Sequence, residues 1–154
     1  MKRNKFCLTI LCFLMLFFIT GCGDKNLLQV EDFKNIIEKD DLTFVDVTSQ
    51  YAGANYIQSA SVASSNGDWQ IEYYVLDSEN NARNMFNTNQ SIFESLNNGN
   101  YASTSVSLNN YSTYSLTIQD TYMYLCQVDN TLLYVNVDKD YTDEVKAIIK
   151  KLGY

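Results

Sequence analysis

The side chains that could carry out chemistry in this chain are carboxylates, hydroxyls and a few cysteines, because the sequence contains no histidine. The absence of histidine excludes histidine-based acid–base catalysis, the Ser-His-Asp and Cys-His arrangements, and the most common zinc sites. An enzyme built on this sequence would have to use carboxylates or a hydroxyl nucleophile.

The densest group of carboxylates lies near the end of the chain, at Asp138, Asp140, Asp143 and Glu144. A calcium-binding loop needs a glycine at its sixth position and a bidentate glutamate at its twelfth, where this chain has Ile149. We therefore expect these acidic residues to cap a helix and match its dipole, with no metal site.

A second pair of carboxylates, Asp68 and Glu72, suggests glycoside hydrolysis. In a strand the two positions share a face but lie about 13 Å apart, at about 3.3 Å per residue. Because the hydrolytic mechanisms need about 5–9.5 Å between the carboxylates, we exclude this pair.

The beginning of the chain has the pattern of an export signal. Lys2, Arg3 and Lys5 precede an apolar run over 6–19, whose helical length of about 21 Å falls short of a hydrocarbon core of about 30 Å. The run ends in Ile19-Thr20-Gly21-Cys22, which resembles the bacterial lipobox. The resemblance implies cleavage before Cys22 and a thioether between its sulfur and diacylglycerol. An ordinary secretory signal is the alternative.

Cleavage would divide the chain into a signal peptide over 1–21, a lipid-anchored spacer over 22–29 and a single globular domain over 30–154. Loss of three of the 11 basic residues leaves eight against 18 acidic ones, so the formal charge changes from −7 to −10. Such acidity disfavours nucleic acid and anionic lipid as electrostatic partners. We expect the membrane to be contacted through the acyl chains alone, and no cofactor to be bound.

The cysteines that remain after cleavage cannot form an internal disulfide. Cys7 and Cys12 lie in the signal, and Cys22 is the predicted lipid attachment site, which leaves Cys126 alone. Cys126 lies within a predicted strand among tyrosines and aliphatic residues. We expect a buried, unreactive thiol there rather than a nucleophile.

Tyrosine is unusually abundant, with 12 in 154 residues. Its large apolar ring and polar tip suit protein interfaces and stacking on sugars, although strands also favour tyrosine for packing alone. The candidate binding surface consists of the tyrosines expected in loops or on outward faces, which are Tyr51, Tyr56, Tyr74, Tyr101 and Tyr111.

Apolar spacing and turn residues predict the elements that would position these side chains. We expect helices from about Val30, after the N-cap Ser78, and before Gly153 at the end of the chain. Asn66-Gly67 predicts a two-residue hairpin turn that pairs Val62 with Ile71.

Four further strands are predicted over 101–137, joined by three-residue loops at 109–111 and 119–121 and by a tight turn at Asp129-Asn130. The tight turn pairs Cys126 with Leu133. The predicted core face contains Leu116, Ile118, Tyr124, Cys126, Leu133, Val135 and Val137. The opposite face is also apolar, at Met123, Leu125, Leu132 and Tyr134, so either that face is partly covered or the register slips by one residue.

The element order predicts an α+β fold: a mostly antiparallel sheet of about six strands with two or three helices packed on one face. The chain also resembles the small lipobox-bearing lipoproteins of clostridial-type bacteria. The shared features are the lipobox, Asp32-Phe33, Ile71-Glu72-Tyr73-Tyr74, the segment 130–135 and Lys151-Leu152-Gly153-Tyr154. The resemblance implies fold and location and brings no activity.

We therefore expect a lipoprotein anchored on the extracytoplasmic side of the cell membrane, with a non-enzymatic domain. The domain would bind an envelope protein, a peptide or a glycan. A carboxylate-dependent envelope enzyme and an accessory subunit of an envelope complex are the two alternatives.

Overall fold

The computed structural model describes residues 24–96 and 101–154, so the predicted signal and Cys22 lie outside the described residues. The elements are, in chain order, α2 (Val30–Lys39), β1 (Thr43–Asp46), η2 (Thr48–Tyr51), β2 (Ile57–Ser65), β3 (Trp69–Leu76), α3 (Glu79–Ser95), β4 (Tyr101–Ser107), β5 (Tyr111–Ile118), β6 (Thr121–Val128), β7 (Thr131–Asp138), η3 (Lys139–Tyr141) and α4 (Thr142–Lys151). None of the helices in the described part of the chain is long and apolar enough to cross a membrane.

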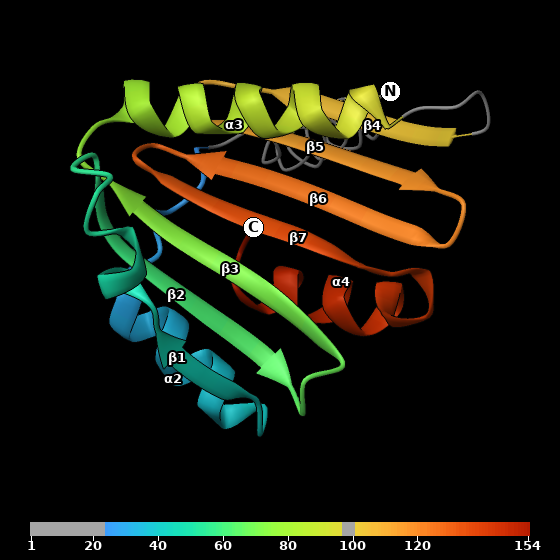
Figure 1. Ribbon diagram of the computed structural model, residues 1–154, viewed down its shortest axis with the longest axis horizontal. Coiled ribbons are helices and arrows are strands. Elements are labelled where there is room, and N and C mark those ends of the chain that lie inside the picture. The colour runs from blue at the N-terminus through green and yellow to red at the C-terminus, as the bar shows by residue number, and fades with distance from the viewer. Residues whose placement is uncertain (1–23, 97–100) are drawn as a thin grey trace, which may run out of the picture.

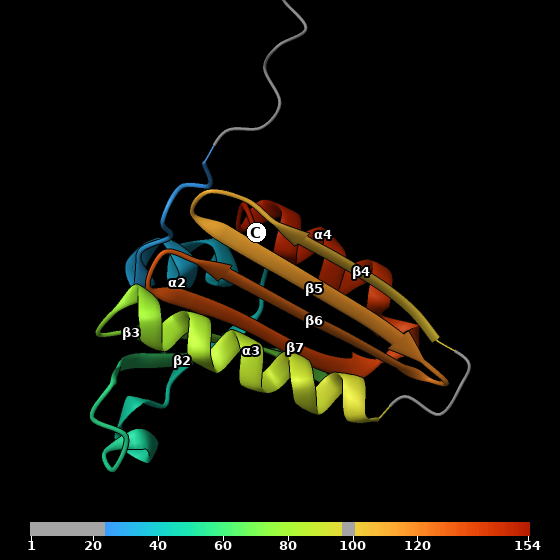
Figure 2. The same cartoon turned by 90° about the horizontal axis from the view of Figure 1, so that it is seen from above.

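The strands form one antiparallel sheet in the order β1-β2-β3-β7-β6-β5-β4 (Figure 1). Strands β1 to β3 form one meander and β4 to β7 form another, and the pairing of β3 with β7 joins them. The α+β prediction is confirmed, with seven strands in place of about six. The two outermost strands are β1 and β4, and Figure 2 shows β4 at its edge of the sheet.

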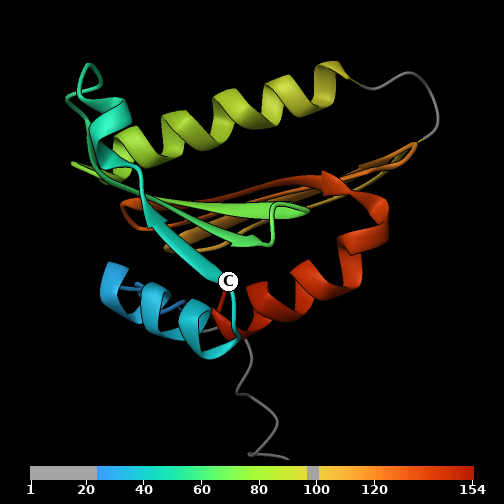
Figure 3. The ribbon, with the colours of Figure 1, turned by 60° about the horizontal axis from the view of Figure 1, so that its bottom comes forward.

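The helices lie on both faces of the sheet, which corrects the prediction that they share one face. Helices α2 and α4 cover one face and α3 covers the other (Figure 3). The physical reason is that β6 and β7 are apolar on both sides: Cys126 and Leu133 pack toward α2 and α4, whereas Leu125 and Leu132 pack toward α3. A strand that is buried on both faces loses the alternation of apolar and polar residues.

The strand registers agree with the prediction at one turn and differ at three. The pairing of Cys126 with Leu133 is confirmed. Ile71 pairs with Ala63 rather than Val62, because Asn66, Gly67 and Asp68 form a three-residue loop.

The other two differences come from loops that are shorter than predicted. The β4–β5 and β5–β6 connections close with two residues, so Val106 pairs with Thr113, and Leu116 with Met123. Leu116 and Ile118 therefore face α3 and not the predicted core face.

The helix ends follow from local chemistry. The Ser78 side chain accepts a hydrogen bond from the Asn81 backbone N–H and caps the start of α3, as predicted. At the end of α4, Gly153 has a φ of 81°, its N–H donates to the Lys150 carbonyl at 3.2 Å, and the Tyr154 N–H donates to the Ile149 carbonyl at 3.1 Å. This pair of bonds is the Schellman motif, in which glycine adopts the left-handed conformation without a Cβ clash.

Candidate binding site

A groove of about 510 Å³ lies between the segment that precedes α2, helix α2 itself and the end of α4; we call it the α2–α4 groove. Its apolar lining comes from Leu27, Leu28, Ile36 and Leu152. Its polar lining comes from Asn26, Asp32, Asn35, Lys39, Lys151 and Gly153. The lining thus offers a ligand both apolar contacts and hydrogen-bonding groups, as binding sites do.

The wall of the groove that precedes α2 is held by Lys25. Its backbone N–H donates to Asn110 Oδ1 at 3.0 Å, and Asn110 Nδ2 donates back to the Lys25 carbonyl at 2.8 Å. Lys25 Nζ donates to the Gly153 carbonyl at 2.8 Å and lies 5.2 Å from the centre of the Tyr111 ring. The residues predicted as a spacer are therefore bonded to the domain at the β4–β5 turn and at the end of α4.

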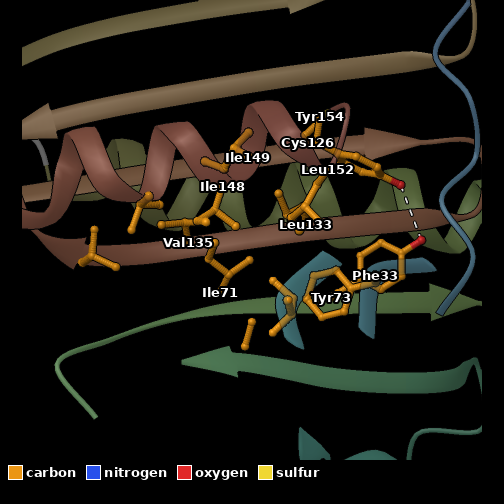
Figure 4. Close-up of a cluster of buried hydrophobic side chains, with 14 of the residues drawn as sticks. Phe33, Ile71, Tyr73, Cys126, Leu133, Val135, Ile148, Ile149, Leu152 and Tyr154 are labelled. Carbon is orange, nitrogen blue, oxygen red and sulfur yellow. Dashed lines mark hydrogen bonds between the residues drawn. The ribbon is translucent and has the colours of Figure 1, made fainter. Parts of the chain in front are cut away.

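A network of buried hydroxyl groups holds the same wall from inside. The Tyr73 hydroxyl donates to the Leu28 carbonyl. It also lies 3.5 Å from the Tyr154 hydroxyl, the contact that is dashed in Figure 4. Thr131 Oγ1 donates to the Val128 carbonyl at 2.8 Å, so the hydrogen bond of 2.6 Å between Tyr154 and Thr131 has Tyr154 as its donor. Burial raises the pKa of Tyr73 and of Tyr154, so both hydroxyls keep their protons and remain donors at neutral pH.

Aromatic packing continues this network into the core. The rings of Phe33 and Tyr73 are stacked with their centres 4.9 Å apart, and Tyr154 meets Tyr73 edge to face at 6.0 Å. Helix α2 supplies Phe33, β3 supplies Tyr73, and Tyr154 follows α4, so this aromatic cluster joins three distant parts of the sequence in the core beside the groove (Figure 4).

The rim of the groove carries both signs of charge. Lys151 Nζ lies 2.7 Å from Asp40 Oδ1 in an ion pair that links the end of α4 to the end of α2. Lys39 and Asp32 also line the groove. A rim of this kind suits a ligand with polar groups of both signs, such as a peptide, better than a simple anion or cation.

A second group of polar side chains lies on the α3 face of β3. The Tyr74 hydroxyl donates to Glu72 Oε2, and the Tyr51 hydroxyl therefore donates to that of Tyr74 at 2.8 Å. Gln70 Nε2 donates to Glu72 Oε1 at 2.8 Å. Both carboxylate oxygens of Glu72 thus accept hydrogen bonds from side chains that hold them in place.

The five tyrosines predicted to form a binding surface do not form one patch. Tyr51 and Tyr74 meet edge to face at 5.5 Å, but Tyr74 is buried, which corrects its expected outward position. Tyr56 lies beside the first half of α3, and Tyr101 lies beside its end. Tyr111 lies with its ring facing the Lys25 ammonium group. Of the five, only Tyr111 contacts a residue of the segment that forms the groove wall.

The remaining candidates take structural positions. Cys126 is buried as predicted, and desolvation raises the pKa of its thiol to about 11, so the nucleophilic thiolate is scarce at neutral pH. Asp138 Oδ1 accepts a hydrogen bond from the Asp140 backbone N–H at 2.9 Å, so it caps the short helix η3 and not α4, whose N-cap Tyr141 makes no side-chain hydrogen bond. Asp143 and Glu144 lie in the first turn of α4, as predicted. Over 24–96 and 101–154, no three His, Cys, Asp or Glu side chains are grouped so as to hold a metal ion.

Sequence reasoning missed the groove because its walls come from both ends of the chain. One signal could have indicated it: an aromatic residue directly after a C-terminal glycine cap, here Tyr154 after Gly153, commonly packs back onto its helix. Lys25 and Asn110 carry no such signal. No family model, no curated protein and no solved structure matches this chain.

Proposed function

We propose that the protein is a lipoprotein anchored through Cys22 to the extracytoplasmic side of the cell membrane, and that it binds a peptide segment of an envelope protein in the α2–α4 groove. The role is non-enzymatic. The observation that supports this proposal is that the segment leading back to Cys22 is itself a wall of the groove, fixed by Lys25 and Leu28.

The position of the groove follows from the reach of the chain. Cys22 and Lys25 are three residues apart, so their Cα atoms lie at most about 11 Å from each other. Acyl chains on Cys22 would hold the groove close to the lipid headgroups, where it meets partners in the same membrane or in the adjoining envelope. Two or three acyl chains are enough for stable anchoring.

Anchoring is tested by producing the wild type and Cys22→Ala in a bacterium that processes lipoproteins. We expect the wild type in the detergent phase of a phase-partitioned membrane extract, with the mass of a diacylglyceryl group on its N-terminal peptide. Cys22→Ala should keep its signal or appear in the aqueous phase. Equal processing and equal partitioning of the two forms would refute the lipid anchor.

Binding in the groove is tested by affinity purification from native membranes. Asn35→Arg places a long cation in the groove from an exposed position on α2. Asn80→Arg makes the same change at an exposed position on α3 and is the matched control. We expect a partner that is recovered with the wild type and with Asn80→Arg but lost with Asn35→Arg. Equal recovery by all three proteins would exclude the groove, and recovery of a glycan would change the class of ligand.

A further inference from the structure

The two edges of the sheet differ in how well they are protected against pairing with another strand. Strand β1 has four residues, ends in the charged Asp46 and has α2 packed beside it. Strand β4 has seven residues, and every one of them is exposed. Natural sheets usually shorten, charge, bend or cover an edge strand to prevent association, and β4 has none of these features.

The backbone of β4 is regular and has hydrogen-bonding groups that point away from the sheet. Its register with β5 runs without a bulge from Tyr101 to Ser107. The Leu108 N–H donates to the Tyr111 carbonyl at 2.9 Å, so the even-numbered residues of β4 point their backbone groups at β5. The outward row therefore comes from the odd-numbered residues, which are Tyr101, Ser103, Ser105 and Ser107.

We propose that β4 pairs with β4 of a second copy of this chain, antiparallel, with a two-fold axis between the two Thr104 residues. Under this register Tyr101 lies opposite Ser107 of the second copy, and Ser103 lies opposite Ser105. All outward N–H and C=O groups then find partners, and the two sheets become one continuous sheet.

The side chains of β4 suit this self-pairing. On the α2 and α4 face, Ala102 lies opposite Val106 of the second copy, and the two Thr104 side chains meet at the axis. Val106 is 40% exposed in the single chain, so pairing removes apolar surface from water. Cross-strand pairs of β-branched residues stabilise a sheet, and no like charges face each other.

Charge favours a second copy at this edge more than elsewhere on the surface. The chain has a formal charge of −7, so two copies repel each other in general, but the stretch 101–118 contains no charged residue. Glu94 lies beside Tyr101 at one end of β4. Arg83, which also pairs with Glu79, lies beside Ser107 at the other end. The two-fold axis brings the end with Arg83 to the end with Glu94 of the second copy.

Under this symmetry both copies can be anchored in the same membrane. This one step rests on the proposed function. The axis is normal to the sheet, so it keeps the α2–α4 grooves and the adjoining 24–29 segments of both copies on the same side. A shared membrane also raises the local concentration of the two strands, which helps an interface of only one strand pair.

Disulfide trapping tests the register in the full-length chain in bacterial membranes. A non-hydrogen-bonded antiparallel pair has its Cα atoms about 4.5 Å apart, within the range of a disulfide. We expect Thr104→Cys to give a disulfide-linked dimer on oxidation, and Val45→Cys on the opposite edge to give no more than the wild type. The wild type reports any dimer formed by Cys22, so failure of the lipid anchor is distinguished from failure of the strand pairing.

Three results would overturn the proposal: no dimer from Thr104→Cys above the wild type, equal dimer from Val45→Cys, or a mixed disulfide of Thr104→Cys with another polypeptide. A second variant does not depend on disulfide geometry. Thr104→Lys places two ammonium groups opposite each other and should reduce the dimer fraction at least about tenfold in light scattering. Val45→Lys should leave it unchanged, and circular dichroism checks that both variants fold.

Discussion

The two faces of the sheet differ in the side chains that they bury: one lies under α2 and α4, and the other lies under α3. Under α2 and α4, two ten-residue helices bury Phe33, Ile37, Val145, Ile148 and Ile149 against an aromatic and hydroxyl network. Helix α3 has 17 residues, rich in asparagine, and buries Ala82, Phe86 and Phe93. Its last turns leave Ile92 51% and Leu96 49% exposed. The larger buried cluster thus lies on the face that also carries the groove, so we expect that face to contribute more to stability.

The largest expected difference between the faces comes from truncating one phenylalanine on each. Phe33→Ala should cost about 4 kcal/mol, because Phe33 is fully buried between Phe44 and Tyr73. Phe93→Ala should cost about 3 kcal/mol, because Phe93 packs near the exposed end of α3, where neighbours can move into the space. Urea unfolding measures the loss in free energy of unfolding for each variant. Equal losses, or a larger loss for Phe93→Ala, would contradict the proposed difference between the faces.

Alkaline pH should destabilise the protein through the buried tyrosines. Burial raises the pKa of Tyr122 to about 12 and raises those of Tyr73 and Tyr154, all on the α2 and α4 face. An unfolded tyrosine ionises near pH 10, so stability is fully present below pH 10 and falls as the pH rises from 10 toward 12.

Urea unfolding at pH 8 to 12 checks this expectation. Tyr154→Phe removes one of these ionisable groups and should make the decline with pH shallower than in the wild type. A free energy of unfolding that stays constant up to pH 12 would show that these hydroxyls are accessible to water.

At neutral pH, Tyr154→Phe should itself reduce the free energy of unfolding by about 1 kcal/mol. The change deletes the donor to Thr131 and keeps the ring against Tyr73. Tyr56→Phe is the matched control, since Tyr56 is exposed. A loss no greater than that of the control would mean that the hydroxyl network adds nothing to the packing.

Substitutions at the helix ends should have effects as small as the loss of this hydroxyl, and similar to each other. Ser78→Ala removes the N-cap of α3, and Gly153→Ala forces a Cβ into the left-handed conformation at the end of α4; each should cost about 1 kcal/mol. Only Gly153→Ala should also loosen the groove, because it displaces Tyr154. Amide hydrogen exchange over 24–29 should rise in Gly153→Ala and remain unchanged in Ser78→Ala.

The sequence predicted the helices well because their apolar spacing and caps are local. The turn at Asp129-Asn130 was also predicted correctly, with Cys126 opposite Leu133. The β4–β5 and β5–β6 registers were wrong because Leu116, Met123 and Leu132 are buried under α3, so no polar face remained to fix the alternation. The β2–β3 register was wrong because the loop at Asn66-Gly67 includes a third residue, Asp68. Apart from Tyr154 after the Gly153 cap, no sequence signal indicated the groove, since it forms only when the segment before α2 and the end of α4 meet in the folded chain.

The strand order has a consequence for the folding rate. Neighbouring strands within each meander are joined by turns, except that β1 is joined to β2 through η2, so their contacts form over short stretches of chain. The β3–β7 pairing alone joins residues from opposite halves of the sequence, such as Ile71 and Val135. Closing so long a loop is slow, so we expect this junction to limit refolding. Val135→Ala should then slow refolding, whereas Val106→Ala at the outer edge should leave the rate nearly unchanged.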